Sequence, residues 1–183
     1  MKLLEFENQK ALDWAQKRTK KLLKKTDFER ENRWAKALFE EDFKSNKTPK
    51  MSLKEVSPKI GLGLFLEEDV RALTYIGEYG GLVRKANRKI DNSNYYTFRY
   101  LETRFRIPYV IDAESQGNIS RFINHSYHPN LLFRNMVVDG ICHIIFYTKR
   151  ACKKGEELTF NYGYDYWKKR EEPISDELFA ADS

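Results

Sequence analysis

The composition of this chain changes abruptly about a quarter of the way along, and that change limits the folds it can adopt. The first 47 of its 183 residues contain neither proline nor glycine and consist mostly of good helix formers. Beyond residue 60, short runs of β-prone residues alternate with glycine and polar turns. We therefore expect an α+β, mainly β fold, in which a helical N-terminal extension precedes a domain of short strands.

The helical stretch divides into two predicted helices, over residues 3–24 and 27–44. Apolar or small residues recur every three or four positions in the first of them. The segment Thr26–Glu29 (TDFE) has the pattern of a capping box, in which two side chains satisfy free amides at a helix start. Residues 45–59 have the composition of a linker that leads into a strand.

The remainder of the chain predicts short strands separated by turns. The expected strands cover Leu62–Leu66, Ala72–Tyr79, Tyr95–Tyr100, Tyr109–Asp112 and Ile141–Thr148. A helical turn is expected within residues 117–125, followed by a loop at 127–130, which contains a proline. The predicted domains are the helical extension (1–47), the main domain (48–170) and an acidic tail (171–183) that we expect to be mobile.

The excess of positive charge lies in the N-terminal third. The formal net charge is +6, and residues 1–60 alone hold 16 Lys/Arg against 10 Asp/Glu. Within Lys17–Lys25, six of nine residues are basic. Such a run can contact nucleic acid, an anionic membrane or an acidic partner, or it can be the solvated face of a helix. No aromatic residue interleaves the run as base stacking would require, which favours the solvated face.

Cysteine content and hydropathy argue against several classes of protein. Cys142 and Cys152 lie ten residues apart without a CxxC partner, so we expect buried free thiols and no structural metal. The chain has no run of 18 apolar residues, and its N-terminus lacks the apolar core of a signal peptide. We expect a soluble intracellular protein, cytoplasmic or chromatin-associated, with secretion into a host left open.

Three segments contain residue types that occur in binding sites. Gly61–Gly63 is a turn at which backbone can approach a ligand, but it lacks the third glycine of a dinucleotide-binding loop. Asn124 and His125 suit a catalytic pair, although the histidines lack a third ligand at metal spacing. Tyr162 can serve as a core aromatic residue. Taken singly, each segment favours a structural role.

The order and spacing of these segments are more specific than any one of them. Gly61–Gly63 is followed by Arg121–Asn130 (RFINHSYHPN) and then by Gly155–Gly163 (GEELTFNYG). This arrangement closely resembles the SET-domain family of protein lysine methyltransferases over roughly residues 58–167. Without flanking cysteine clusters, the chain is similar to compact bacterial and viral members, chlamydial ones among them.

The resemblance implies a knot-like crossing, in which the Asn-His-Ser segment threads beneath the chain that carries the catalytic tyrosine. It also implies S-adenosylmethionine as the methyl donor, S-adenosylhomocysteine as the product, and no metal. The implied cofactor-binding residues are Gly61, Leu62, Gly63, Asn124 and His125. Arg121 is a candidate for the cofactor carboxylate, with a structural ion pair as the alternative. Trp167 is a candidate cover for the adenine, with surface packing as the alternative.

In this family the target lysine enters a channel of aromatic rings, which favour an amine cation and its methyl groups. The resemblance implies that Tyr162 is the catalytic tyrosine, that Tyr96 is a second catalytic residue, and that both line the channel together with Phe160. Phe160 stands where the family has either phenylalanine or tyrosine, and phenylalanine implies a di- or trimethylated product. Asn161 replaces the usual aspartate, and Tyr127 replaces a cysteine of many members.

The implied activity is methylation of a lysine side chain on a protein, with histones and histone-like proteins among the candidates. The N-terminal helices are candidates for contact with substrate, a partner or a second copy of the chain. Two alternative functions remain open. One is a module that binds cofactor or peptide without catalysis, against which the presence of Tyr162 argues; the other is a basic chromatin adaptor acting through Lys17–Lys25.

Overall fold

The computed structural model describes residues 4–101 and 109–167. Its two long helices are α1 (Gln9–Leu22) and α2 (Thr26–Ser45). The short helical segments are α3 (Arg88–Asp91), the 3-10 turn η1 (Ile119–Phe122) and α4 (Tyr164–Trp167). The strands are β1 (Leu4–Phe6), β2 (Met51–Ser57), β3 (Gly61–Leu66), β4 (Tyr75–Glu78), β5 (Gly81–Lys85), β6 (Thr97–Tyr100), β7 (Tyr109–Asp112), β8 (Asn124–His125), β9 (Leu131–Val138), β10 (Ile141–Thr148) and β11 (Thr159–Phe160). This architecture confirms the predicted fold class.

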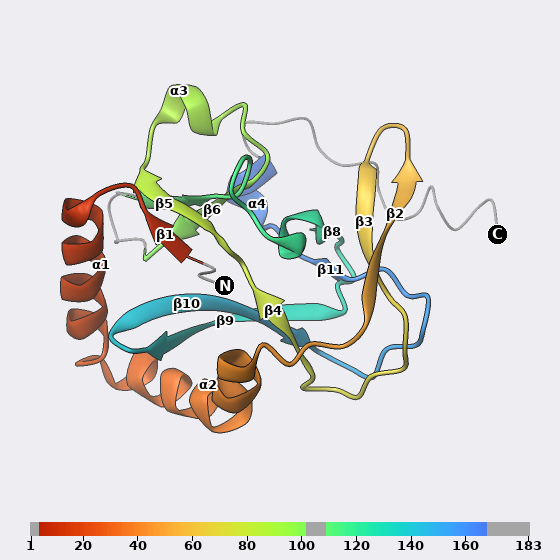
Figure 1. Ribbon diagram of the computed structural model, residues 1–183, viewed down its shortest axis with the longest axis horizontal. Helices are drawn as coiled ribbons and strands as arrows, with labels where there is room; N and C mark the ends of the chain where they lie inside the picture. Colours follow the sequence, from red (N-terminus) through yellow and green to blue (C-terminus); the bar gives the residue numbers. More distant parts are fainter. Residues whose placement is uncertain (1–3, 102–108, 168–183) are drawn as a thin grey trace.

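The strands form several small sheets (Figure 1). One has the order β1-β5-β7-β6 and another the order β4-β10-β9, while β2 pairs with β3 and β8 with β11. The β8–β11 pair is parallel, with Asn124 opposite Thr159 and His125 opposite Phe160. This register lays the Asn-His segment beside the strand that leads to Tyr162, so the two segments of the predicted crossing meet here.

The predicted helix over residues 3–24 is wrong at its start. Leu4–Phe6 forms β1, which pairs in parallel with β5, and Leu4 is only 8% exposed. Pairing with a strand distant in sequence overrides the local helical tendency here. Helix α1 begins after Asn8, whose side-chain oxygen accepts a hydrogen bond from the Ala11 amide at 3.1 Å. The capping box at the second helix is also wrong, because Lys25 is the cap residue and makes no side-chain cap bond.

Helices α1 and α2 pack onto the strands. Ala15 of α1 belongs to the main hydrophobic cluster. Phe39 of α2 is buried against Tyr147, with ring centroids 5.0 Å apart. Asn32 accepts a hydrogen bond from the Val137 amide at 2.7 Å, so α2 also covers the edge of β9. The helices therefore share the core of the strands, while the predicted domain boundaries stay predictions and the acidic tail lies outside the described residues.

Cys142 and Cys152 are buried and have free thiols, as expected. Among residues 4–101 and 109–167, no three His, Cys, Asp or Glu side chains cluster as they would around a metal ion. In the same part of the chain, no helix is both long and apolar enough to cross a bilayer.

Candidate functional site

The glycine turn and the Asn-His segment, far apart in sequence, are in contact. Asn124 donates two hydrogen bonds from its side-chain amide, to the Leu62 carbonyl at 3.2 Å and to Glu157 Oε1 at 2.7 Å. A Cβ atom at Gly63 would lie 2.5 Å from the same carboxylate oxygen and 3.1 Å from the Asn124 amide nitrogen. A larger residue would have to displace the side chains of Glu157 and Val56, so glycine suits this close approach of the turn.

Glu157 is a residue of this site that sequence reasoning did not single out. It lies in the segment Gly155–Gly163, five positions before Tyr162, and that placement is the only signal the sequence offers. Burial raises the pKa of its carboxyl group, and the hydrogen bond from Asn124 opposes that rise only in part. This carboxyl group lies beside the glycine turn, and in its ionised form it would favour a ligand with positive charge.

His125 and Tyr162 hold each other in place. The Tyr162 backbone amide donates to His125 Nδ1 at 3.1 Å, and the Tyr162 hydroxyl donates to the Ile123 carbonyl at 2.8 Å. Burial raises the pKa of Tyr162 well above its usual range, and the nearby Tyr166 and Tyr96, among others, raise it further. Tyr162 therefore keeps its proton at neutral pH, and its hydroxyl is available for hydrogen bonds and not as a phenolate base.

Aromatic rings pack around Tyr162. Trp167 stacks parallel to it at 5.9 Å, Tyr166 meets it edge-on at 4.6 Å, and Phe160 packs at 4.7 Å. Phe160 is 7% exposed and stacks in turn on Phe98 at 5.9 Å. The indole Nε1 of Trp167 is buried and has no hydrogen-bond partner among the described residues. The predicted channel residues Phe160 and Tyr162 are thus in direct contact, and the predicted adenine cover, Trp167, stacks on Tyr162.

The side chains of Tyr96 and Arg121 are in contact with each other. The guanidinium of Arg121 lies 5.4 Å from the centroid of the Tyr96 ring, and the Tyr96 carbonyl accepts a hydrogen bond from the Tyr79 hydroxyl at 2.8 Å. Arg121 donates to the carbonyls of Ala113 and Glu114 at 3.0 and 2.7 Å. Its side chain thus fixes the loop after β7, and its contact with a cofactor carboxylate stays a prediction.

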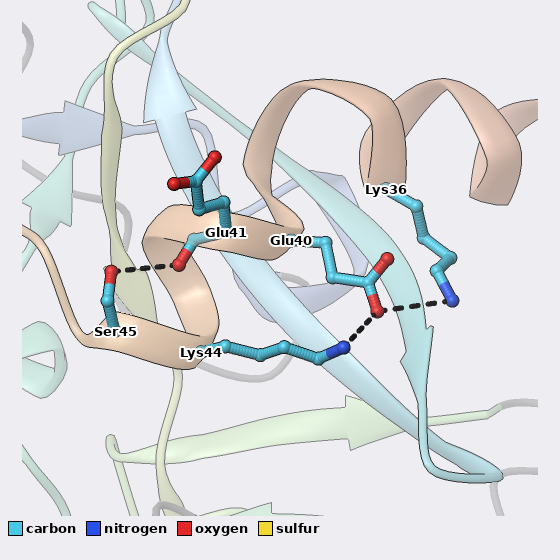
Figure 2. A pocket seen from close by; sticks show the side chains of 5 residues that line it. All are labelled: Lys36, Glu40, Glu41, Lys44 and Ser45. Carbon is cyan, nitrogen blue, oxygen red and sulfur yellow. Dashed lines mark hydrogen bonds and ion pairs between the residues drawn. The ribbon is translucent and has the colours of Figure 1, made fainter.

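An open depression lies on α2 and is lined by residues of that helix alone (Figure 2). Glu40 pairs there with Lys36 at 3.3 Å and with Lys44 at 2.7 Å, and the Ser45 hydroxyl donates to the Glu41 carbonyl at 2.8 Å. The charges neutralise one another on a single helix. None of the motif residues lines this depression, so it does not compete with the site around Tyr162.

Comparison with known proteins agrees with this geometry. A family model described as the SET domain matches residues 61–163. The chain is 36% identical over 113 residues to the histone-lysine N-methyltransferase trr of Drosophila melanogaster, covering 57% of this chain and 4% of that protein. It is 34% identical over 128 residues to the histone-lysine N-methyltransferase ASHH3 of Arabidopsis thaliana, covering 67% and 34%. It is 33% identical over 108 residues to the histone-lysine N-methyltransferase set-2 of Caenorhabditis elegans, covering 57% and 7%.

The chain therefore spans about a third or less of the length of these relatives. The matched region begins at the glycine turn and ends just after Tyr162, so it contains the contacts among Gly63, Asn124 and Glu157 and the hydrogen bond between His125 and Tyr162. Because this match covers more than half of the sequence, the chain belongs to the SET-domain family.

Proposed function

We propose that this protein transfers a methyl group from S-adenosylmethionine to a lysine side chain of a protein substrate. The observation that carries the proposal is the position of Tyr162, whose hydroxyl is bound by Ile123 and whose backbone is bound by His125. His125 adjoins Asn124, which contacts the glycine turn. A cofactor site and an aromatic channel would thus meet at one hydroxyl. The names of the relatives support a histone or histone-like substrate.

We assign cofactor binding to Gly61–Gly63, Asn124 and His125. Gly61 has a φ of 83° and nothing within 4 Å of where its Cβ would be, which leaves space beside the turn. Asn124 donates both amide hydrogens within the protein, and its side-chain oxygen accepts no bond from the described residues. That oxygen, the turn backbone and the Glu157 carboxylate suit a ligand with amino groups and a sulfonium. When bound, S-adenosylmethionine supplies an electrophilic methyl group.

The residues around Tyr162 suit the acceptor side of this reaction. A free lysine has a pKa of about 10.4 and must lose its proton before it can attack a methyl group. Partial burial of the amine in this channel removes water and favours the neutral form, although the ring faces attract a cation. The Tyr162 hydroxyl donates to Ile123, so its oxygen can accept an amine N–H and thereby orient the nitrogen lone pair. Positioning of this kind lowers a reaction barrier by several kcal/mol.

The test is transfer of labelled methyl groups from S-adenosylmethionine to purified core histones and bacterial histone-like proteins, followed by mass spectrometry of the modified lysine. We expect label on lysine that depends on Tyr162. Binding of the cofactor without transfer to any of these proteins or to a cell lysate would favour the alternative, a SET-like binding module. Failure to bind the cofactor would contradict the assignment of Gly61–Gly63 and Asn124.

A further inference from the structure

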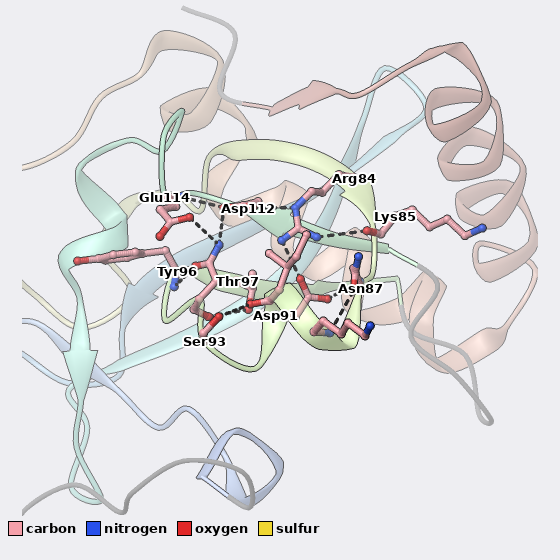
Figure 3. A network of polar contacts seen from close by, with 12 residues as sticks. Arg84, Lys85, Asn87, Asp91, Ser93, Tyr96, Thr97, Asp112 and Glu114 are labelled. Carbon is pink, nitrogen blue, oxygen red and sulfur yellow. Dashed lines mark hydrogen bonds and ion pairs between the residues drawn. The ribbon is translucent and has the colours of Figure 1, made fainter.

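A network of charged and amide side chains lies directly beside Tyr96 (Figure 3). Arg84 of β5 donates from Nε to Asp112 Oδ2 and from Nη2 to Asp91 Oδ1, both at 2.7 Å. Asn94 is 3% exposed and donates its side-chain amide hydrogens to Asp112 Oδ1 at 3.0 Å and to Glu114 Oε2 at 3.3 Å. The network joins β5, α3, β7 and the turn before β6.

We propose that this network positions Tyr96 and that Asn94 is its central residue; the proposal rests on the function assigned above, in which Tyr96 lines the lysine channel. Asn94 Oδ1 accepts a hydrogen bond from the Tyr96 backbone amide at 2.8 Å. The Tyr96 carbonyl accepts bonds from the Tyr79 hydroxyl at 2.8 Å and from the Ala113 amide at 3.0 Å. The backbone of Tyr96 is therefore fixed on both sides of its side chain.

The charges of the network determine which way the Asn94 amide faces. Burial alone would raise the pKa of Asp112, but hydrogen bonds from the Glu114 amide, Arg84 and Asn94 lower it below its usual range. Asp112 is therefore ionised at neutral pH. With its amide reversed, Asn94 would point an oxygen at the Asp112 carboxylate, an acceptor against an acceptor. The NH₂ group must face the carboxylates, which leaves Oδ1 to bind the Tyr96 amide.

This arrangement makes Asn94 a positioning residue for recognition of the target lysine. Its hydrogen bonds to Tyr96, Asp112 and Glu114 lie within the network, so its loss should spare the cofactor site. Its substitution also leaves the Arg84 bridge between Asp91 and Asp112 in place, so the local fold should survive. A residue with only a structural role would instead change stability without a selective effect on the protein substrate.

Three substitutions of Asn94 separate these roles. Asn94→Ala removes the acceptor for Tyr96 and both donors. Asn94→Ser keeps a side-chain oxygen that can accept from the amide two residues on, as Ser does in turns. Asn94→Asp keeps the shape, but repulsion from the ionised Asp112 should turn its carboxylate away and so break the bond to the Tyr96 amide. It provides a second test if the alanine variant does not fold. The matched control is Asn32→Ala, which removes another asparagine bonded to a backbone amide, at 2.7 Å, on α2.

The measurements are the KM for core histones, kcat, cofactor affinity and hydrogen exchange at the Tyr96 amide. Loss of one buried hydrogen bond, about 1.4 kcal/mol, corresponds to a factor of ten. We therefore expect Asn94→Ala and Asn94→Asp to raise the KM about tenfold with unchanged cofactor affinity. Exchange at Tyr96 should also be faster in Asn94→Ala, with most of both effects recovered in Asn94→Ser. Asn32→Ala should retain the wild-type KM and Tyr96 exchange.

The outcomes distinguish this inference from the proposed function. If the wild type transfers methyl groups but folded Asn94→Ala and Asn94→Asp retain its KM and Tyr96 exchange, the positioning role is wrong. Equal effects of Asn94→Ala and Asn94→Ser would also contradict it, because the retained acceptor would then have no influence. If the wild type transfers no methyl group, the proposed function fails, while hydrogen exchange at Tyr96 still decides whether Asn94 holds this residue.

Discussion

Tyr162 carries a single hydroxyl group on a ring that packs against several aromatic side chains. Tyr162→Phe removes the donor to Ile123 and leaves the stack on Trp167, so the variant should fold. If the hydroxyl orients the lysine amine, labelled-methyl transfer should fall by about one to three orders of magnitude. Cofactor affinity measured by calorimetry is the control and should stay unchanged. Near-normal turnover would mean that another tyrosine, with Tyr96 the first candidate, has this role.

We expect Asn124 to contribute to the affinity for the cofactor and not to recognition of the substrate lysine. Asn124→Ala removes the bonds to Leu62 and Glu157 and leaves a half-buried carboxylate without the donor that Asn124 supplies. We expect cofactor affinity, measured by calorimetry, to fall at least about tenfold, which corresponds to about 1.4 kcal/mol. Circular dichroism establishes that the variant is folded. Wild-type affinity in a folded variant would refute the assignment of Asn124.

Phe160 bears on how many methyl groups are added. Its ring lies among Phe98, Phe146 and Tyr162, so the face it presents is apolar. An apolar wall leaves no hydrogen bond to hold a methylated amine away from further attack, and we expect di- or trimethyl-lysine from the wild type. Phe160→Tyr should shift the product towards monomethyl-lysine in mass spectra taken at long reaction times. Monomethyl-lysine alone from the wild type would contradict this prediction.

Glu157 gives the site a pH-dependent effect on stability. Because burial raises its pKa, the folded protein binds this proton more tightly than the unfolded chain does. At pH values above the pKa of Glu157 in the folded protein, the ionised carboxylate therefore lowers the free energy of unfolding. This loss of stability disappears as the pH falls through that pKa. Glu157→Gln keeps an acceptor for Asn124 without the charge. Its free energy of unfolding should exceed that of the wild type at neutral pH, with a difference that shrinks in acid; a constant difference in denaturation across pH would contradict the prediction.

At the scale of elements, strands with uninterrupted apolar runs are predictable and strands defined by distant pairing are not. The bounds of β7 and β10 match the predicted Tyr109–Asp112 and Ile141–Thr148. Strand β9 was not predicted, because Arg134 and Asn135 interrupt its apolar run. Strand β1 was assigned to a helix because its pairing partner lies far along the sequence.

The residues of the candidate site also fall into those that the sequence predicts and those that only the fold reveals. The motifs identify Gly63, Asn124 and Tyr162, whose residue types are restricted by close approach or by chemistry. They do not identify Asn94, because its importance comes from carboxylates on other elements that only the fold brings near. The role of the basic run on α1 is another feature that the sequence alone does not decide. Lys17, Lys20 and Lys21 are exposed, which fits a solvated face, and contact with nucleic acid stays a prediction.

For the whole molecule, the question is whether the N-terminal helices form part of the folding unit. Phe39 of α2 is 1% exposed and packs in one cluster with residues of β4, β9 and β10. Removal of α2 would expose this cluster to water. The helices can therefore contact a substrate or partner only with their outer faces, while their inner faces complete the core.

Phe39→Ala tests this view without deleting the helix. If α2 belongs to the core, the loss of a buried aromatic side chain should lower the free energy of unfolding by about 3–5 kcal/mol. The matched control is Leu38→Ala, the neighbouring position on the same helix, where the wild-type side chain is 43% exposed. Its effect should stay below about 1 kcal/mol, since little apolar area is buried there. Chemical denaturation of both variants measures these changes in the free energy of unfolding. Similar small losses in the two variants would mean that α2 is an appendage whose packing the SET domain does not need.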